Sequence, residues 1–177
     1  MLKPVSFAVL LAFLLPIAGA TFANVDNAML PEPVRVPAGN VFKLETVGTG
    51  EITYECREKK DAAGAFEWAF VAPVATLWDA QKKSIGKYYG GPTWEAVDGS
   101  KVTGKQVAIA PASPGNIPLQ LVKADPAMGN GAMTGVTYIQ RLDTKGGVAP
   151  SSACNAAAAG TKQQVGYQAK YVFYKQN

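Results

Sequence analysis

The segment "VGYQAKYVFY", residues 165–174, carries the clearest structural signal in this chain of 177 residues. Its apolar and aromatic residues recur at every second position: Val165, Tyr167, Ala169, Tyr171 and Phe173. Side chains of a β-strand alternate between two faces, so this spacing predicts a strand with one buried face.

Similar runs, rich in Val, Ile, Thr and aromatic residues, recur along the chain between Gly, Pro and Asp residues. We expect strands at 41–47, 51–57, 66–71, 75–78, 85–89, 101–110, 118–123, 133–142 and 165–174. About nine strands with regular turns predict an all-β fold, either a β-sandwich or a partly open barrel. Little helix is expected, apart from a turn or two within residues 154–164. An eight-stranded outer-membrane barrel has about this length, but Cys56, Pro118 and several charges interrupt its runs.

The first 23 residues have the pattern of a secretory signal peptide. Lys3 precedes an apolar run from Val5 to Ile17, and small residues then allow cleavage after Ala20 or Ala23. A retained membrane anchor is the alternative, but the run is shorter than the roughly 20 apolar residues that a membrane span needs. We therefore expect an exported protein, located in the periplasm or outside the cell, with no membrane span after cleavage.

The rest of the chain has the size of one ordinary domain. Residues 24–40 contain several prolines and are expected to be extended, and residues 41–177 are expected to form a single β domain. Loss of Lys3 lowers the formal net charge by one, from +4 to +3, and the lysines are scattered rather than clustered. A nucleic-acid-binding surface needs a concentrated basic patch, so we expect no nucleic-acid partner.

The chain has two cysteines, Cys56 and Cys154, and no histidine. In an oxidising compartment the two cysteines are expected to form a structural disulfide, since no Cys-x-x-Cys motif indicates a redox-active thiol. The absence of histidine excludes Ser-His-Asp and Cys-His catalysis and removes the commonest metal ligand. Carboxylate chemistry, a lysine nucleophile or no catalysis remain, and we expect no cofactor and no metal.

The stretch "GKYYGGPTWEAVDGSKVTGK", residues 86–105, concentrates aromatic and charged residues around two turns. The simplest interpretation is structural, with Trp94 in the core and residues 94–97 forming a short strand between the bends. The functional alternative is an aromatic binding site made of Tyr88, Tyr89 and Trp94, with Asp98 or Lys101 as polar contacts. Glu95 and Asp98 also allow the hypothesis of a glycosidase pair.

A second candidate surface lies in "IQRLDTKGG", residues 139–147. Arg141, Asp143 and Lys145 occupy alternate positions, so we expect them on one face of a strand. They form either a solvated charged face or an anion-binding rim, and we include Arg141 and Lys145 among the candidate ligand-binding residues.

Several blocks resemble domain-of-unknown-function family 3455, a family of secreted bacterial and fungal proteins. They are "GEITYECR" (50–57), "WAFVAPVATLWD" (68–79), residues 86–105, "VTYIQRLDTKGGVAPSSAC" (136–154) and "YQAKYVFY" (167–174). The resemblance implies that Cys56 and Cys154 match recurrent cysteines, and it implies no particular activity. Where the family pattern leads us to expect histidine, this chain has Tyr88, so any chemistry needing an imidazole would be lost.

The sequence therefore predicts a non-enzymatic binding or interaction module, with no catalytic residue assigned. Its partner would be a small molecule, a glycan or an envelope protein. The alternative is a carboxylate-dependent hydrolase that acts on an envelope or extracellular glycan.

Overall fold

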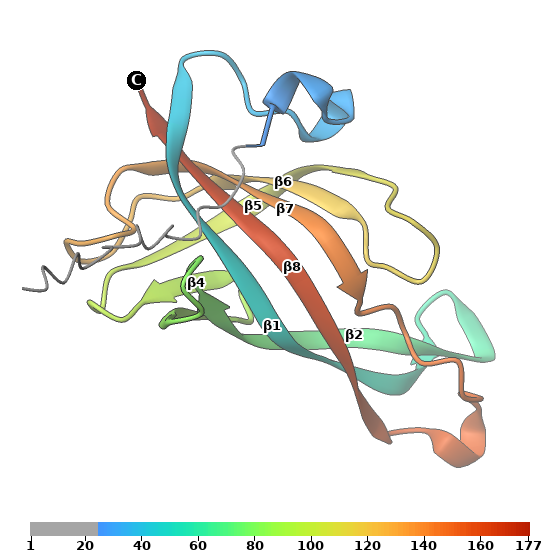
Figure 1. Ribbon diagram of the computed structural model, residues 1–177. Helices are drawn as coiled ribbons and strands as arrows, with labels where there is room; N and C mark the ends of the chain where they lie inside the picture. Colours follow the sequence, from blue (N-terminus) through green and yellow to red (C-terminus); the bar gives the residue numbers. More distant parts are fainter. Residues whose placement is uncertain (1–24) are drawn as a thin grey trace, which may run out of the picture.

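The computed structural model describes residues 25–177, which form a closed antiparallel barrel of eight strands (Figure 1). Each strand pairs with the next along the chain, and the last pairs with the first. The strands are β1 (Asn40–Lys59), β2 (Ala62–Trp78), β3 (Ser84–Tyr89), β4 (Thr93–Ala96), β5 (Lys101–Ala110), β6 (Leu119–Ala124), β7 (Val136–Gly146) and β8 (Lys162–Gln176). The prediction of an all-β fold with one disulfide is confirmed, and of the two expected architectures the sheet adopts a barrel, which is fully closed.

Helix is limited to three short 3-10 turns, η1 (Asn27–Met29), η2 (Glu32–Val34) and η3 (Ala156–Ala158), in the described part of the chain. The turn η3 lies where one or two helical turns were predicted. Among residues 25–177 no helix is long and apolar enough to cross a membrane. The predicted signal peptide, residues 1–23, lies outside the described residues.

Two pairs of predicted strands are joined into single long strands. Residues 41–57 all belong to β1, and residues 66–78 all belong to β2. The break expected at residues 48–50 does not occur, because these residues pair with β2 on one side and with β8 on the other. Gly48 and Gly50 both face the barrel interior. A Cβ atom at Gly48 would lie 2.6 Å from the ring of Tyr171, so the glycine makes room for this ring. The strand predicted at 133–142 begins only at Val136.

The interior is filled by one apolar cluster to which every strand contributes. Its largest fully buried side chains are Trp94, Tyr171 and Phe173. The ring centroid of Trp94 lies 4.8 Å from that of Tyr88 and 5.7 Å from that of Tyr171. The alternation predicted for β8 is confirmed, since Tyr167, Ala169, Tyr171 and Phe173 all belong to this interior cluster.

The two ends of the barrel differ. One end, called the covered end, carries the β2–β3, β4–β5 and β6–β7 connections. The β6–β7 connection packs Met133, which is 2% exposed, onto the interior cluster. Ser100 and Asp98 hold this connection, since Ser100 Oγ accepts from Met133 N (3.1 Å) and Asp98 Oδ2 accepts from Ala132 N (2.7 Å). The other end, called the open end, carries the remaining connections.

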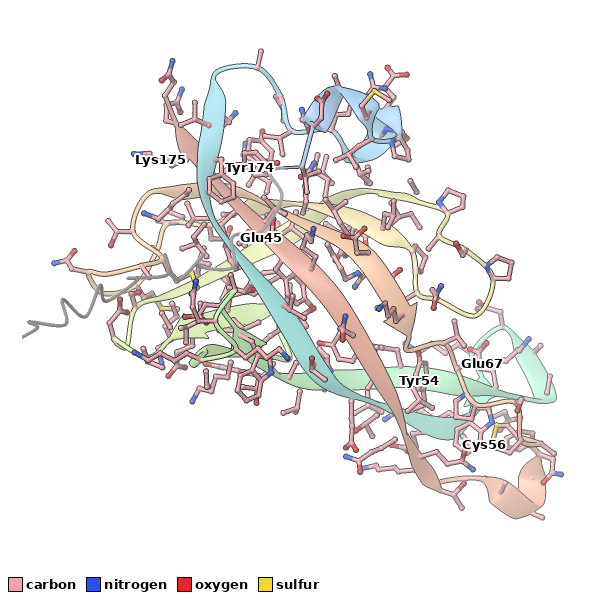
Figure 2. All side chains as sticks on the ribbon, in the orientation of Figure 1. Glu45, Tyr54, Cys56, Glu67, Tyr174 and Lys175 are labelled. Atoms are coloured by element: carbon pink, nitrogen blue, oxygen red, sulfur yellow. A yellow bond between two sulfur atoms is a disulfide. The ribbon has the colours of Figure 1, made fainter. Side chains whose placement is uncertain are left out.

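Residues 25–39, called the N-terminal strap, lie on the outside of the barrel. They were expected to be extended, but they form η1 and η2 and bury Val34 and Val36 against the outer faces of β5, β6, β7 and β8. Figure 2 shows Tyr174 beside the strap, while Tyr54 and Cys56 lie toward the opposite end of the molecule.

A buried glutamine attaches the strap to the barrel. Gln140 Nε2 donates to Val34 O (2.7 Å) and to Asn27 Oδ1 (3.0 Å), and Gln140 Oε1 accepts from the Tyr174 hydroxyl (2.8 Å). Asn27 also bonds to both backbone polar groups of Val36. Because buried polar groups are costly when unpaired, these bonds fix the position of the strap.

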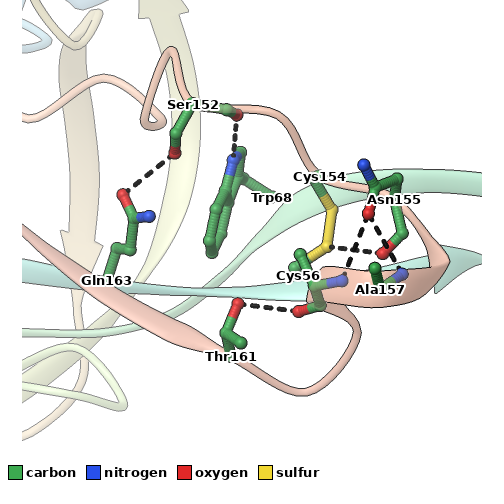
Figure 3. Close-up of a disulfide and its surroundings, with 9 residues drawn as sticks. Cys56, Trp68, Ser152, Cys154, Asn155, Ala157, Thr161 and Gln163 are labelled. Carbon is green, nitrogen blue, oxygen red and sulfur yellow. Dashed lines mark hydrogen bonds between the residues drawn. A yellow bond between two sulfur atoms is a disulfide. The ribbon is translucent and has the colours of Figure 1, made fainter.

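The disulfide joins β1 to the β7–β8 connection (Figure 3). The sulfur atoms of Cys56 and Cys154 are bonded, and the two residues are 98 positions apart in the sequence. Around it, Trp68 Nε1 donates to Ser152 O (2.8 Å), and Cys56 N donates to Thr161 O (3.0 Å). The β7–β8 connection is therefore held against the long β1–β2 hairpin, beside which it lies in Figure 1.

Replacing both cysteines with alanine is expected to lower the free energy of unfolding by about 2–5 kcal/mol, because a closed loop of about 100 residues no longer restrains the unfolded chain. Urea denaturation followed by tryptophan fluorescence measures this change. Equal midpoints for the oxidised wild type and the double variant would contradict it, and the reduced wild type should match the double variant.

The substitution Gln140→Leu is expected to destabilise the protein by about 2–3 kcal/mol, because the Val34 carbonyl and the Tyr174 hydroxyl lose their partner in a buried site. The double variant Gln140→Leu/Tyr174→Phe removes the orphaned hydroxyl and should recover part of the loss. Thermal and urea denaturation of the single and double variants provide the comparison. Strictly additive losses would show that the two side chains are not coupled.

Candidate ligand-binding pocket

A pocket of about 480 Å³ opens at the open end of the barrel. Apolar side chains form much of its wall, among them Ile52, Phe70, Pro73 and Ile117. Its polar lining side chains come from five different strands: Tyr54, Tyr88, Gln106, Gln120 and Arg141. The turn between β3 and β4, residues 90–92, contributes to the same wall.

The strand register explains why these polar side chains converge. Arg141 lies opposite Gln120 on one side and Tyr171 on the other, and Tyr171 is fully buried in the interior. Tyr88 lies opposite Trp94, whose side chain is also interior. Cross-strand neighbours point to the same face of a sheet, so this ring of residues faces the inside of the barrel.

Arg141 is the one charged side chain in the lining of this pocket. Its Nε and Nη2 groups donate to the carbonyl oxygen of Pro118, at 3.2 Å and 2.9 Å. No carboxylate pairs with it in the described part of the chain. The pocket therefore contains a positive charge that has no negative partner within residues 25–177.

Four tyrosines lie near enough to this charge to be affected by it, and two of them, Tyr54 and Tyr88, line the pocket. Burial raises the pKa of Tyr54, Tyr88, Tyr167 and Tyr171, and the positive charge of Arg141 partly opposes the increase in each. All four hydroxyls are therefore protonated near neutral pH and can donate hydrogen bonds.

Three of these hydroxyls already have partners. Tyr54 donates to the carbonyl oxygen of Gly147 (2.7 Å), and the hydroxyls of Tyr167 and Tyr171 lie 3.3 Å apart. No hydrogen bond from the Tyr88 hydroxyl to another described residue is found. Among the four tyrosines and Arg141, the groups that remain available to a ligand are thus the Tyr88 hydroxyl and part of the Arg141 guanidinium.

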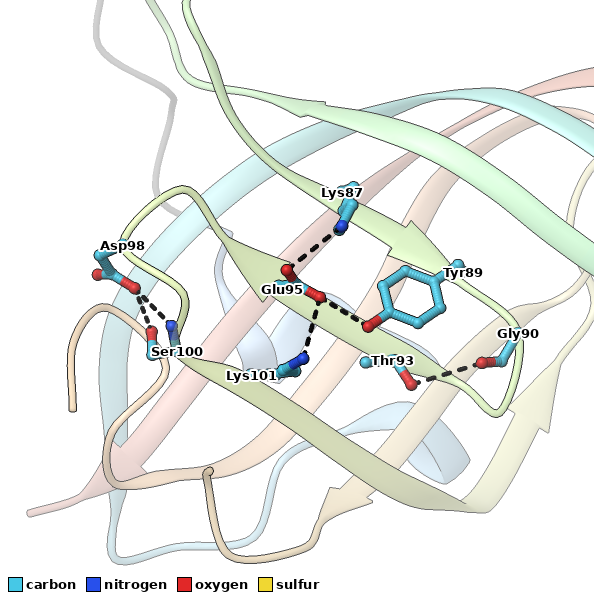
Figure 4. A network of polar contacts seen from close by, with 8 residues as sticks. All are labelled: Lys87, Tyr89, Gly90, Thr93, Glu95, Asp98, Ser100 and Lys101. Atoms are coloured by element: carbon cyan, nitrogen blue, oxygen red, sulfur yellow. Dashed lines mark hydrogen bonds and ion pairs between the residues drawn. The ribbon is translucent and has the colours of Figure 1, made fainter. Parts of the chain in front are cut away.

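The structure brings together only some of the predicted site residues. Tyr88 and Arg141, taken from the two predicted surfaces, line the same pocket. Trp94 is 1% exposed and supports the Tyr88 ring from within the core. Tyr89 and Lys101 lie on the outer face of the barrel, where they surround Glu95 (Figure 4).

Glu95 and Asp98 are both engaged away from the pocket. Glu95 accepts from the Tyr89 hydroxyl (2.7 Å) and pairs with Lys87 (3.3 Å) and Lys101 (3.5 Å). Asp98 accepts from the hydroxyl of Ser100 (2.6 Å) and, as described above, from the β6–β7 connection.

These hydrogen bonds, led by those from Tyr89 and Ser100, lower the pKa of Glu95 and of Asp98. Both groups are therefore ionised at neutral pH. Neither is suited to be the general acid that a glycosidase pair requires.

The expectation that Arg141 and Asp143 share a face is wrong. The register of β7 and β8 shifts between Leu142 and Lys145, and Asp143 has a φ of +47°. This irregularity breaks the alternation, so Arg141 points inward while Asp143 pairs with Lys170 outside (3.0 Å). Lys145 lines a separate hollow of about 500 Å³ together with Asp143 and Lys170, and it takes no part in the barrel pocket.

Sequence reasoning missed Tyr54, Phe70, Gln106 and Gln120 as pocket residues. Strand periodicity contains a signal for Tyr54 and Gln106. Every second residue of β1 from Ile52 to Cys56 is Ile52, Tyr54 or Cys56, so these three share one face. The same spacing places Val102, Gly104 and Gln106 on one face of β5. A polar side chain in such an inward series indicates either an interior hydrogen bond or a pocket.

The outer-face cluster around Lys170 contains a buried carboxylate, Glu45, whose side chain is 1% exposed. Lys170 Nζ lies 3.4 Å from Glu45 Oε1 and 3.0 Å from Asp143 Oδ2. Burial raises the pKa of Glu45, and the charge of Lys170 offsets this only in part. The charged form of Glu45 is therefore disfavoured by folding.

The described residues contain no group of three or more His, Cys, Asp or Glu side chains placed to hold a metal ion. The fold and the pocket together define a closed up-and-down β-barrel with one end covered and the other end hollow.

The model of the family described as "Protein of unknown function (DUF3455)" matches residues 37–175, and the chain belongs to this family. The match spans both cysteines and all the pocket-lining residues, and it confirms the resemblance seen in the sequence blocks. No curated protein and no solved structure gives a significant match to the chain.

The variant Glu45→Gln is expected to change the pH dependence of stability. The folded pKa of Glu45 lies above 4.5, so folding takes up a proton and wild-type stability falls as the pH rises through this raised value. The variant cannot titrate, so its unfolding free energy should fall less between pH 4.5 and 7. At pH 7 it should equal or exceed the wild type by up to about 1 kcal/mol, because the ionised form of Glu45 is disfavoured by burial and Lys170 keeps Asp143 as a partner.

Urea denaturation across this pH range measures the effect, with Glu51→Gln on the exposed outer face of β1 as the control for loss of one charge. A loss of more than about 2 kcal/mol in Glu45→Gln at pH 7 would contradict the prediction, because the ion pair would then outweigh the cost of burial.

Proposed function

We propose that this protein is a non-enzymatic binding module that holds a small, partly apolar molecule in the open end of its barrel. The observation that carries this proposal is the difference between the two ends. Met133 and its neighbours cover one end, whereas the other retains a cavity of about 480 Å³. Barrels of eight strands either fill their interior with side chains or hold one small ligand.

The size and chemistry of the pocket support this function. Small-molecule sites usually have volumes of about 300–1,000 Å³ and apolar walls with a few polar groups that orient the ligand. Phe70 stands at the edge of the pocket with 57% of its surface exposed, and its ring meets that of Tyr54 edge-to-face at 6.2 Å. An exposed aromatic ring beside a concave pocket offers apolar contact to a bound molecule.

The wall of the pocket that contains Tyr54 is held in place before a ligand arrives. The disulfide and the Trp68–Ser152 hydrogen bond fix the β7–β8 connection, and Tyr54 is bonded to Gly147 at its start. A preorganised site loses less conformational entropy on binding, which favours affinity.

The alternative hydrolytic function has less support. The pocket lining contains no carboxylate, and the chain has no histidine. Glu95 and Asp98 are engaged in structural interactions elsewhere.

The proposal places the protein outside the cytoplasm, in the periplasm or at the cell exterior. A structural disulfide suits an oxidising compartment, and the N-terminal sequence has the pattern of a signal peptide.

The proposal predicts saturable binding of an anilinonaphthalene dye at the open end. Two dyes with the same ring system are used: neutral N-phenyl-1-naphthylamine and its sulfonated form, 8-anilino-1-naphthalenesulfonate. The variant Gln106→Trp places an indole in the pocket and should weaken dye binding at least about tenfold. The preceding residue of β5 points outward, so Lys105→Trp is the matched control and should bind as the wild type does.

Fluorescence titration gives the dissociation constants, and circular dichroism confirms that each variant is folded. Binding of neither dye, or equal binding by folded Gln106→Trp and Lys105→Trp, would show that the pocket does not hold such molecules.

A further inference from the structure

We propose that the ligand of this pocket is a monoanion, an apolar or aromatic carboxylate, and that Arg141 is its anchoring residue. This inference rests on the proposed function and specifies the class of ligand that the same site takes. It follows from the charge, the available donors and the shape of the lining.

The charge of the pocket sets the sign of the ligand. Arg141 brings a permanent positive charge into a wall built largely from apolar and aromatic side chains, and no carboxylate in the described residues balances it. A charge in such surroundings is stabilised by a partner of opposite sign. A cationic ligand would be repelled, and a neutral ligand would leave the charge unpaired.

The orientation of the guanidinium favours a carboxylate. The Nε–Nη2 edge of Arg141 is occupied by the carbonyl oxygen of Pro118, which fixes the plane of the group. The Nη1–Nη2 edge has no acceptor in the described part of the chain. Two parallel N–H groups on one edge match the two oxygens of a carboxylate in a bidentate pair.

A second donor stands in the same lining. The Tyr88 hydroxyl is protonated near neutral pH, because burial raises its pKa, and it has no partner among residues 25–177. Gln120 Nε2 donates to Gln106 Oε1 (2.6 Å), which leaves the amide nitrogen of Gln106 as a further donor. The same bond leaves Gln120 Oε1 as an acceptor, but Arg141, Tyr88 and Gln106 can all donate, as binding of an anion requires.

The single cation limits the charge of the ligand. A doubly charged phosphate would retain one unbalanced negative charge against apolar walls, whereas a carboxylate is neutralised by Arg141 alone. Ile52, Pro73 and Ile117 line the rest of the pocket, and Phe70 stands at its edge. These side chains contact the apolar body of the ligand while its carboxylate reaches Arg141.

The test compares two molecules of nearly the same shape, 1-naphthylacetate and 1-naphthylacetamide, as competitors of the neutral dye N-phenyl-1-naphthylamine. The acid should displace the dye from the wild type at a concentration about tenfold lower than the amide, because only the acid forms charge-assisted hydrogen bonds. In Arg141→Gln this ratio should fall to about one, with the affinity for the amide retained. Lys145→Gln removes the same charge outside the pocket and should keep the wild-type ratio.

Arg141→Met, which suits an inward position, replaces the glutamine variant if circular dichroism shows that the latter is unfolded. An acid-to-amide ratio near one in the wild type, or a ratio that survives the loss of Arg141, would overturn the proposal. If the dye passes the Gln106→Trp test but the ratio is one, only the anionic specificity is wrong. If the dye fails that test, the binding function itself is wrong.

Discussion

The contact between Tyr171 of β8 and Gly48 of β1 determines how the barrel interior is filled. A side chain at position 48 would collide with the Tyr171 ring, so the glycine lets the large ring lie across the barrel. Tyr171 then packs against Tyr88 and Trp94, with ring centroids 5.1 Å and 5.7 Å away. Tyr88 belongs to both this aromatic cluster and the pocket lining, and Tyr171 lies opposite Arg141 in the sheet. The floor of the pocket is therefore formed by residues of the core.

The two ends of the barrel differ because different interactions hold their connections. At the covered end, Asp98 and Ser100 bind the β6–β7 connection over the core. At the open end, the disulfide draws the β7–β8 connection sideways onto the β1–β2 hairpin. Asp98 and Cys154 therefore have comparable structural roles, although one holds a cover in place and the other keeps a loop away from the opening.

The sequence predicts the strands of this fold better than it predicts their closure and their irregularities. The alternation of apolar residues located β8, and the presence of two cysteines indicated the disulfide. The interpretation of Gly48 as a strand break was wrong, because a glycine that makes room inside a strand cannot be distinguished by sequence from a glycine in a turn. The face assigned to Asp143 was wrong because the spacing of residues does not reveal a strand irregularity. Tyr88 and Arg141 were both chosen as candidates, but their shared pocket depends on strand pairing across the barrel, which spacing along the chain does not encode.

The pairing of β1 with β8, which closes the barrel, also affects the order in which the chain can fold during its synthesis. Thr46 pairs with Tyr171, so strands formed at opposite ends of the described chain must meet before the sheet has no free edge. Until β8 has been synthesised, β1 offers unpaired backbone groups that other extended chains could pair with. Such distant pairing makes folding slow relative to helical proteins of the same size. The growing chain therefore has to remain unaggregated until its last strand has emerged.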